Sequence, residues 1–277
     1  MLLSIIMKFN IACIQTNSKN DMTANIDDVS VHIHNAAGDG ADMITTPENS
    51  FFMGSSAKEL FENAFFENKH PAILHMQELA SKYNMWILIG SVAVKVENSH
   101  KFANRSIMIN PKGDIAKTYD KIHLYNAQVK GGETHAESER YLAGGKTAIC
   151  QSPWANIGMT ICYDLRFPHL FRKLSQSGAK VITVPSAFTK LTGEAHWHTL
   201  LQARAIENTC YIVAPAQTGN HPADRKTYGH SLIIDPWGKI LQDAGTCEGF
   251  IISQIDIKVA DDVRKQLPSL EHDRNFD

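Results

Sequence analysis

Short apolar runs rich in β-branched residues recur along the 277-residue chain, and longer helix-like stretches separate several of them. Runs of this length are typical of strands that other layers cover. The expected strands are residues 9–15, 86–94, 106–110, 157–162, 181–184, 211–216 and 231–235, and the expected helices are residues 21–37, 70–83, 168–177 and 194–208. Alternating strands and helices predict an α/β fold built in layers.

Two segments between strand-like runs indicate β-hairpins. Residues 110–113 (NPKG) and 235–238 (DPWG) carry the side chains that tight turns require. Hairpins added to an α/β pattern predict a mixed sheet or a pair of sheets. The sequence contains no proline- or serine-rich linker, charge block or internal repeat, so we expect a single domain over residues 1–277.

Composition indicates which partners the protein does not bind and in which cellular compartment it is expected. The formal net charge is −2 with 20% charged residues, so no overall field attracts nucleic acid or an anionic membrane. The apolar residues 1–6 are too few for a signal-peptide core or a membrane span, and we interpret them as a short leader. Five cysteines are scattered without a CxxC pair, which argues against a disulfide framework and a zinc site. We expect a cytoplasmic protein that binds neither nucleic acid nor membranes.

Three strand-like runs are each followed by a reactive side chain. Glu48 and Lys121 lie two residues after the runs 43–46 and 115–119, and Cys162 directly follows the run 157–161. Open α/β sheets place ligands at strand ends, so these side chains are candidates to share one pocket. Each also has a structural alternative: an inert core thiol for Cys162, a solvated lysine for Lys121 and a helix cap for Glu48.

The thirteen histidines raise the possibility of a metal site or a Cys–His protease. His196 and His198 lie two apart in an expected helix, so they point to different faces and make a poor ligand pair. His123 and His230 lie in strand or turn segments and need only packing or hydrogen-bonding roles. We therefore predict no metal site.

Seven ordered segments carry a resemblance to a known family. They are the strand with Gln15, Pro47-Glu48, YDKIHL (119–124), CYDLRFP (162–168), VPSAF (184–188), HWHTLLQARAIEN (196–208) and YGHSLIIDPWG (228–238). With them the chain resembles the nitrilase superfamily of carbon–nitrogen hydrolases, in its Nit branch of small amidases, over nearly its whole length. The resemblance implies a four-layer αββα sandwich. It also implies a homodimer or larger homo-oligomer, with the segments after Pro168 and Glu194 as candidate interfaces.

The resemblance further implies roles for the three strand-end residues: Glu48 as general base, Lys121 as transition-state stabiliser and Cys162 as nucleophile. These residue types suit amide hydrolysis, because an amide carbonyl needs a strong nucleophile, a stabilised oxyanion and a protonated leaving amine. We expect Lys121 to favour the Cys162 thiolate, and the backbone N–H of Tyr163 to be a second oxyanion donor. Neither a metal nor an organic cofactor is required.

A second glutamate is expected beside Lys121. Glu137, in HAESERYLAGG (135–145), matches by its distance from the following glycine a second glutamate of the family's sites, and Glu133 and Glu139 are the alternatives. Two carboxylates around one ammonium would keep a buried lysine charged. The surrounding segment, residues 126–145, is long and polar, so we interpret it as a lid or as an ordinary surface loop.

The residues after the nucleophile separate branches of the superfamily. True nitrilases continue with Trp-Glu and decarbamoylating relatives with other patterns, whereas the chain reads Cys-Tyr-Asp-Leu-Arg-Phe. The resemblance therefore implies a cysteine-dependent amidase that converts a terminal amide of a small carboxylate-bearing substrate, similar to deaminated glutathione, to acid plus ammonia through a thioester. The alternatives are an omega-amidase acting on 2-oxoglutaramate or 2-oxosuccinamate, an N-carbamoyl hydrolase, a nitrilase, and a non-catalytic binding protein.

A carboxylate-bearing substrate needs a cationic contact, and Arg166 lies four residues after the nucleophile. Arginine binds carboxylates through two parallel hydrogen bonds. A buried ion pair with Asp164 or Glu207 is the structural alternative for Arg166. Tyr163 and Phe188 are expected to line the substrate pocket, with ordinary core packing as their alternative.

Overall fold

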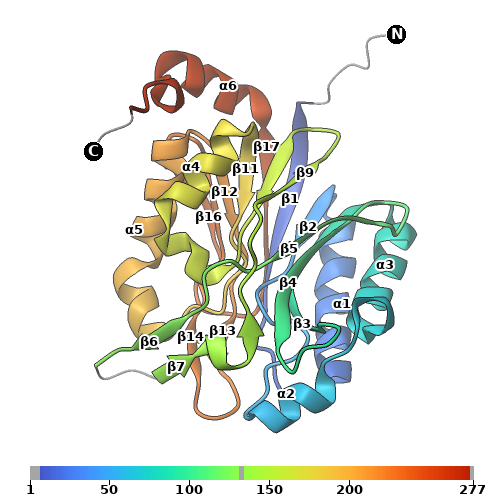
Figure 1. The fold of residues 1–277 in the computed structure, drawn as a ribbon. Helices are drawn as coiled ribbons and strands as arrows, with labels where there is room; N and C mark the ends of the chain where they lie inside the picture. The colour runs from blue at the N-terminus through green and yellow to red at the C-terminus, as the bar shows by residue number, and fades with distance from the viewer. Residues whose placement is uncertain (1–6, 131–133, 275–277) are drawn as a thin grey trace.

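Two large β-sheets pack face to face, and helices cover the outer face of each (Figure 1). The computed structural model describes residues 7–130 and 134–274, so the leader predicted at residues 1–6 lies outside the described residues. The predicted four-layer αββα sandwich is confirmed. No helix in the described part of the chain is long and apolar enough to cross a membrane.

The first sheet has the order β17-β1-β2-β3-β4-β5, and β8 pairs with β4. Its strands are β1 (Lys8–Gln15), β2 (Met43–Thr45), β3 (Trp86–Lys95), β4 (Phe102–Ile109), β5 (Ile115–Asp120), β8 (Tyr141–Leu142) and β17 (Gly249–Asp256). Strands β1, β2 and β3 are parallel, so their carboxyl ends meet at one edge. Helices α1 (Met22–Gly38) and α3 (Pro71–Tyr83) pack on the outer face.

The second sheet has the order β16-β15-β12-β11-β10-β9. Its strands are β9 (Ala148–Gln151), β10 (Asn156–Met159), β11 (Ala179–Thr183), β12 (Tyr211–Ala214), β15 (Leu232–Ile234) and β16 (Ile240–Asp243). Strands β10, β11 and β12 are parallel. Helices α4 (Pro168–Gln176) and α5 (Lys190–Asn208) cover its outer face.

Shorter elements complete the fold. They are the helices α2 (Ala57–Asn63) and α6 (Ile257–Gln266), the hairpins β6 (Asn126–Gln128)–β7 (Thr134–Ala136) and β13 (Thr218–Asn220)–β14 (Lys226–Tyr228), and the 3₁₀ helices η1 (Glu67–Lys69), η2 (Glu137–Glu139), η3 (Cys162–Arg166) and η4 (Ser269–Glu271). In Figure 1, α2 and the two hairpins lie at the lower end of the molecule and α6 lies at the top.

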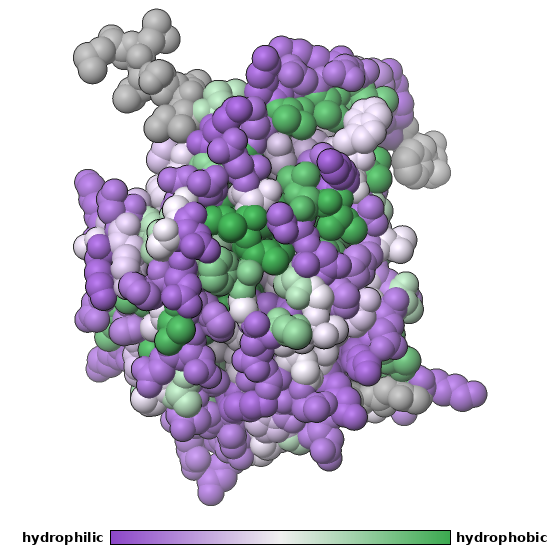
Figure 2. Space-filling model, turned by 180° about the vertical axis from the view of Figure 1, so that it is seen from behind, coloured by the Kyte–Doolittle hydropathy of each residue, from purple (hydrophilic) through white to green (hydrophobic). Residues whose placement is uncertain are grey.

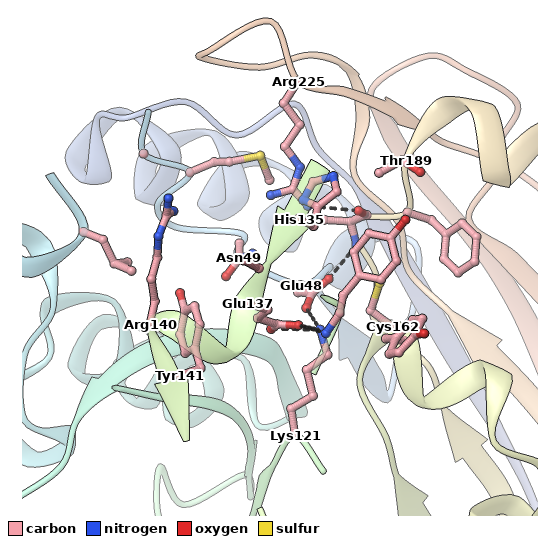
Figure 3. Close-up of a pocket in the computed structure, with 18 of the residues that line it drawn as sticks. Glu48, Asn49, Lys121, His135, Glu137, Arg140, Tyr141, Cys162, Thr189 and Arg225 are labelled. Atoms are coloured by element: carbon pink, nitrogen blue, oxygen red, sulfur yellow. Dashed lines mark hydrogen bonds and ion pairs between the residues drawn. The ribbon is translucent and has the colours of Figure 1, made fainter. Parts of the chain in front are cut away.

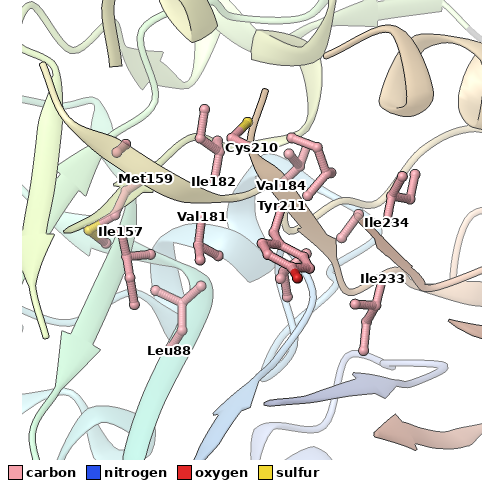
Figure 4. Packing of buried hydrophobic residues seen from close by; sticks show 14 of the residues in the cluster. Leu88, Ile157, Met159, Val181, Ile182, Val184, Cys210, Tyr211, Ile233 and Ile234 are labelled. Carbon is pink, nitrogen blue, oxygen red and sulfur yellow. The ribbon is translucent and has the colours of Figure 1, made fainter. Parts of the chain in front are cut away.

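Side chains alternate between two cores along the inner strands. In β1, Ile11 and Cys13 lie in the core between the sheets, whereas Ala12 and Ile14 lie in the core beneath α1 and α3. Figure 4 shows the first of these cores, with Leu88 of β3 close to residues of β10 and β11. Because both faces of these strands are buried, their sequences read as nearly continuous apolar runs.

One edge of the sandwich has no helical cover. Strands β16 and β17 lie at the ends of their sheets and contact each other. These two strands carry the half-buried apolar residues Ile240, Leu241, Phe250 and Ile251. These side chains therefore remain partly open to solvent in the single chain. Figure 2 shows apolar residues gathered near the middle of one face of the molecule.

Most predicted elements are confirmed, but several of their boundaries differ by one to four residues, and two of these differences have a clear physical reason. The strand predicted at residues 157–162 ends at Met159, because the backbone turns into η3 at Cys162. Helix α5 begins at Lys190 instead of residue 194, with Gly193 inside its first turn. Glycine is unfavourable inside a helix, so the sequence placed the helix start after Gly193. Glycine is required there because a Cβ at residue 193 would lie 2.3–2.8 Å from the Tyr228 side chain. Both predicted hairpin turns form.

Gly90 allows the backbone before Glu48 to reach its position. A Cβ at residue 90 would lie 2.0 Å from the carbonyl oxygen of Thr46 and 2.4 Å from that of Pro47. Real Cβ atoms do not approach backbone oxygen this closely, so only glycine fits between β3 and the Thr46–Pro47 segment. The Gly90 N–H also donates to Thr46 Oγ1 at 3.0 Å, which ties this segment to β3.

We expect Gly90→Ala to lower the free energy of unfolding by at least about 1–3 kcal/mol, the usual range for overpacking a close-packed site. Urea denaturation would measure the loss. Gly38→Ala is the matched control, because a Cβ at the end of α1 meets nothing within 4 Å. Equal stability of the two variants would show that the Thr46–Pro47 backbone can move without cost.

Candidate active site

A cavity of about 340 Å³ opens where the carboxyl ends of the parallel strands from both sheets meet. Its volume lies in the range of small-molecule sites. The structure brings every predicted site residue to this cavity: Glu48, Lys121, Glu137, Cys162, Tyr163, Arg166 and Phe188. Figure 3 shows Lys121 rising from below toward Glu48 and Glu137, with Cys162 beside them.

Lys121 lies at the centre of the site, and only 2% of its side chain is exposed. Its Nζ donates to Glu48 Oε1 at 2.8 Å and to both carboxylate oxygens of Glu137, at 2.9 and 3.0 Å. Burial lowers the pKa of this ammonium, but Glu137 and Glu48 outweigh it and raise the pKa well above its ordinary value. Lys121 is therefore a permanent cation.

The second glutamate is held by contacts far apart in the sequence. Glu137 Oε2 accepts the backbone N–H of Tyr125 at 2.6 Å, and Asn104 Nδ2 donates to both Glu137 Oε1 and Glu48 Oε1, at 3.1 and 3.0 Å. Glu139 lines the cavity without an ion pair to Lys121. The other alternative, Glu133, lies outside the described residues. Glu137 is thus the described glutamate that orients Lys121 together with Glu48.

Cys162 occupies a sharp turn between β10 and η3. Its φ of +47° is in the left-handed region, which non-glycine residues adopt at a cost and which clusters at functional sites. The turn is fixed by Asp164, whose buried carboxylate accepts from the N–H groups of Ile161 and His123, at 2.9 and 3.1 Å, and from Tyr119 Oη at 2.7 Å. These bonds hold the thiol at the cavity.

The Cys162 thiol is protonated in the resting site. Burial raises its pKa far above the ordinary value and Glu48 raises it further, while Lys121 and the N–H of Ala187 act in the opposite direction. Lys121 does favour the thiolate, as expected, but two carboxylates already balance its charge. Burial and Glu48 together outweigh Lys121, so the pKa of the Cys162 thiol stays above its ordinary value.

Glu48 is the ionised partner of this neutral thiol. Burial raises the pKa of its carboxyl, but Lys121 and, more weakly, Arg225 and Cys162 lower it below the ordinary value. Its Oε2 accepts the Ala187 N–H at 3.0 Å. The site thus pairs a carboxylate base with an adjacent thiol acid, the arrangement that general-base activation of a nucleophile requires.

Aromatic and cationic groups form the wall beyond the thiol. The guanidinium carbon of Arg166 lies 5.3 Å from the centre of the Phe188 ring, and Arg166 Nη2 lies 3.3 Å from His196 Nδ1. The alternative of a buried ion pair for Arg166 is wrong, because Asp164 pairs with His123 and Glu207 pairs with Arg204. Arg166 is therefore available to a ligand.

Sequence reasoning missed several polar residues of the site, and Asn104 and Arg225 show why. Asn104 lies in the middle of β4, where an amide between apolar residues gives no signal of its long-range partners. Arg225 lines the cavity from the β13–β14 hairpin, in a polar segment that resembles an ordinary loop.

The histidines behave partly as expected. His196 and His198 diverge, toward Arg166 and Asp243 respectively. His198, His230 and Asp243 nevertheless form a trio whose ligand atoms lie within 4.8 Å of one another, a grouping that could hold a metal ion and that the sequence did not predict. The Asp243 carboxylate joins the two rings at 3.1 and 2.9 Å. None of the three lines the cavity.

Known proteins resemble the chain in sequence and in structure. Residues 10–265 match the family model described as carbon-nitrogen hydrolase. A deaminated glutathione amidase of Synechocystis is 41% identical over 264 residues, which are 94% of the chain and 96% of that relative. The NitFhit protein of Caenorhabditis elegans superposes with a TM-score of 0.91 at 34% identity over 96% of the chain, which spans 65% of NitFhit. Saccharomyces cerevisiae Nit3, described as a member of branch 10 of the nitrilase superfamily, gives 0.85 at 28% identity over 95% of both chains.

The charge on Glu48 sets the ionisation of the thiol. We expect Glu48→Gln to lower the pKa of Cys162, because the substitution removes a negative neighbour and leaves Lys121 less neutralised. The pH dependence of thiolate ultraviolet absorbance would measure this, with Cys162→Ala versions of both proteins subtracting the other cysteines. A thiolate that forms at higher pH in the variant than in the wild type would contradict the arrangement.

Proposed function

The chain belongs to the carbon–nitrogen hydrolase family, and from this premise we propose that it is an amidase in which Cys162 attacks the amide carbonyl. The resemblance to the nitrilase superfamily is confirmed by the family match and by the Nit relatives. The chain is thus a hydrolase of carbon–nitrogen bonds other than peptide bonds. The observation that carries the proposal is the juxtaposition of a strained, cavity-facing thiol with an ionised Glu48 and a permanently charged Lys121.

Acylation begins with proton transfer from the thiol. Glu48 takes the proton as Cys162 Sγ bonds to the carbonyl carbon, so that no free thiolate accumulates. The negative charge moves to the carbonyl oxygen, where Lys121 Nζ and the Tyr163 N–H stabilise it. Glu48 then gives the proton to the leaving nitrogen, the carbon–nitrogen bond breaks, and a thioester remains on Cys162.

Deacylation repeats these steps with water. Glu48 accepts a proton from a water molecule whose oxygen attacks the thioester carbonyl, and the same two donors bind the second oxyanion. Collapse of this intermediate releases the carboxylic acid, and the Cys162 sulfur recovers its proton from Glu48. Glu137 does not exchange protons in this scheme, because both of its oxygens hold Lys121 in position.

The substrate is a small amide that carries a carboxylate, and deaminated glutathione is the specific proposal. The Synechocystis relative is named for that substrate, and the cavity supplies arginine side chains that suit carboxylates. The amides of deaminated glutathione are internal, so its hydrolysis releases an amine, whereas a primary amide releases ammonia. An assay must therefore detect both kinds of leaving group.

A panel of four substrate types tests this function. We expect hydrolysis of deaminated glutathione to exceed that of 2-oxoglutaramate, an aliphatic nitrile and an N-carbamoyl amino acid, measured as acid formed. Faster turnover of 2-oxoglutaramate would favour an omega-amidase instead. Folded protein that hydrolyses none of the four would reject the amidase and support a binding role.

The assembly and compartment are part of the same proposal. We propose a cytoplasmic homodimer formed through α4 and α5, on which Leu191 and Ile206 are 45% and 48% exposed. Apolar side chains exposed on one helix suit burial against a partner. All five cysteines are free thiols, which suits a reducing compartment. Sedimentation equilibrium should then give about twice the mass of one chain.

The oxyanion role of Lys121 gives a quantitative prediction. Lys121→Met should lower the single-turnover acylation rate by at least roughly a hundredfold, the scale for losing one oxyanion donor. Cys162→Ala should abolish turnover with the same fold by circular dichroism. A Lys121→Met variant with an altered KM and an unchanged kcat would make Lys121 a binding residue only.

A further inference from the structure

The cavity carries an excess of positive charge beyond the Lys121–carboxylate cluster. Besides Glu48, Lys121 and Glu137, the charged lining residues among those the structure describes are Arg140, Arg166 and Arg225 against one carboxylate, Glu139. Arginine stays protonated under all ordinary conditions. Three arginines facing one glutamate therefore favour an anionic ligand, and their positions decide where its charges lie.

Hydrogen bonds hold the backbone of Arg225 in a fixed position. It lies at the end of the turn in the β13–β14 hairpin, where its carbonyl oxygen accepts the His221 N–H at 2.8 Å. The His221 ring is buried and contacts Ser18 O at 2.8 Å and Thr227 Oγ1 at 2.6 Å. These bonds tie the hairpin to the loop after β1, so the arginine enters the cavity from a fixed direction.

The guanidinium of Arg225 is only partly used by the protein. Nη2 donates to the carbonyl oxygen of Ala187 at 3.1 Å, but the buried Nε has no hydrogen-bond partner among the described residues. Nor does any described carboxylate form an ion pair with this side chain. A buried donor without an acceptor needs an explanation, and a ligand is the simplest one inside a substrate cavity.

Arg225 lies close to Glu48, the residue that would protonate the leaving nitrogen in the proposed mechanism. Ala187 bonds to both Arg225 and Glu48. The Ala187 carbonyl oxygen accepts from Arg225, and the Ala187 N–H donates to Glu48 Oε2 at 3.0 Å. Glu48 delivers the proton to the leaving nitrogen. Figure 3 shows Arg225 entering from the side opposite Lys121. Arg166 follows the nucleophile on another wall, against Phe188.

We infer that Arg225 binds a carboxylate on the amine part of the substrate, through Nε and a neighbouring Nη in the two-bond geometry that arginine favours. Arg166 then receives the carboxylate of the acyl part. The enzyme therefore selects amides with a negative charge on each side of the scissile bond, such as those whose leaving amine is an amino acid or a dipeptide. This inference rests on the proposed amidase function.

The test compares two substrates that differ in one charge. They are deaminated glutathione and its C-terminal amide, in which the glycine carboxylate is replaced by a neutral carboxamide. Both give the same acid from the acyl part, so one assay reports kcat/KM for each. The ratio of the two values isolates recognition of the charge, because any effect of Arg225 on Glu48 acts on both substrates.

We expect the wild type to prefer the charged substrate by roughly tenfold to a hundredfold, the range for hydrogen bonds to a charged group. Arg225→Gln should bring the ratio close to one. Arg225→Lys should keep part of the preference, because the charge remains and the paired donors are lost. Arg140→Gln, which removes an exposed arginine of the same cavity, should keep the wild-type ratio.

Three results would overturn the inference: a wild type without preference, an Arg225→Gln variant that retains it, or an Arg140→Gln variant that loses it equally. Failure of the amidase function would look different, since the wild type would then hydrolyse neither compound nor any primary amide. Hydrolysis of both compounds at equal rates would reject the Arg225 subsite and leave the amidase function intact.

Discussion

The site depends on one buried cation that is shared by two carboxylates. Moving a lone ammonium out of water costs several kcal/mol, and the cost is offset only where opposite charges and further hydrogen bonds surround it. Lys121 has two glutamates at 2.8–3.0 Å, and Asn104 links these glutamates to each other. Glu48 and Lys121 follow β2 and β5, Asn104 lies within β4, and Glu137 lies in η2, so these segments must keep their relative positions. The electrostatics of the site therefore depends on the packing of the first sheet.

This balance of charge also bears on the proposed nucleophile. Burial and Glu48 raise the pKa of the Cys162 thiol more than Lys121 lowers it, so the resting site favours the protonated thiol. The ammonium remains available for the oxyanion, a charge that exists only during the reaction. An arrangement of this kind stabilises the transition state more than the resting enzyme.

Local sequence patterns predicted the alternating strands and helices and made the strand-end residues candidates for one pocket. The four-layer sandwich and the roles of those residues rested on the resemblance. Apolar runs with buried faces located β1, β3 and β11, and the residues after β2, β5 and β10 supplied Glu48, Lys121 and Cys162. The choice of Glu137 over its neighbours rested on resemblance, since the contact with Tyr125 that fixes it depends on the folded loop.

Other features depend on contacts between distant segments and leave no local signature. Gly193 is compatible with a helix only because the Tyr228 side chain packs against it, and Arg225 reaches the site only because a hairpin bonds to the loop after β1. The raised pKa of Cys162 has the same origin, because burial and Glu48 raise it while Lys121 and the Ala187 N–H lower it.

The central claim is that the acyl group is bound covalently to Cys162, while Lys121 stabilises the oxyanion and Glu48 transfers the proton. Rapid quenching of the enzyme with deaminated glutathione in acid, followed by intact-mass and peptide analysis, tests it most directly. The account predicts a transient mass increase equal to the acyl group, located on the peptide that contains Cys162 and absent from Cys162→Ala. Product formation without this adduct, or an adduct on another residue, would contradict it.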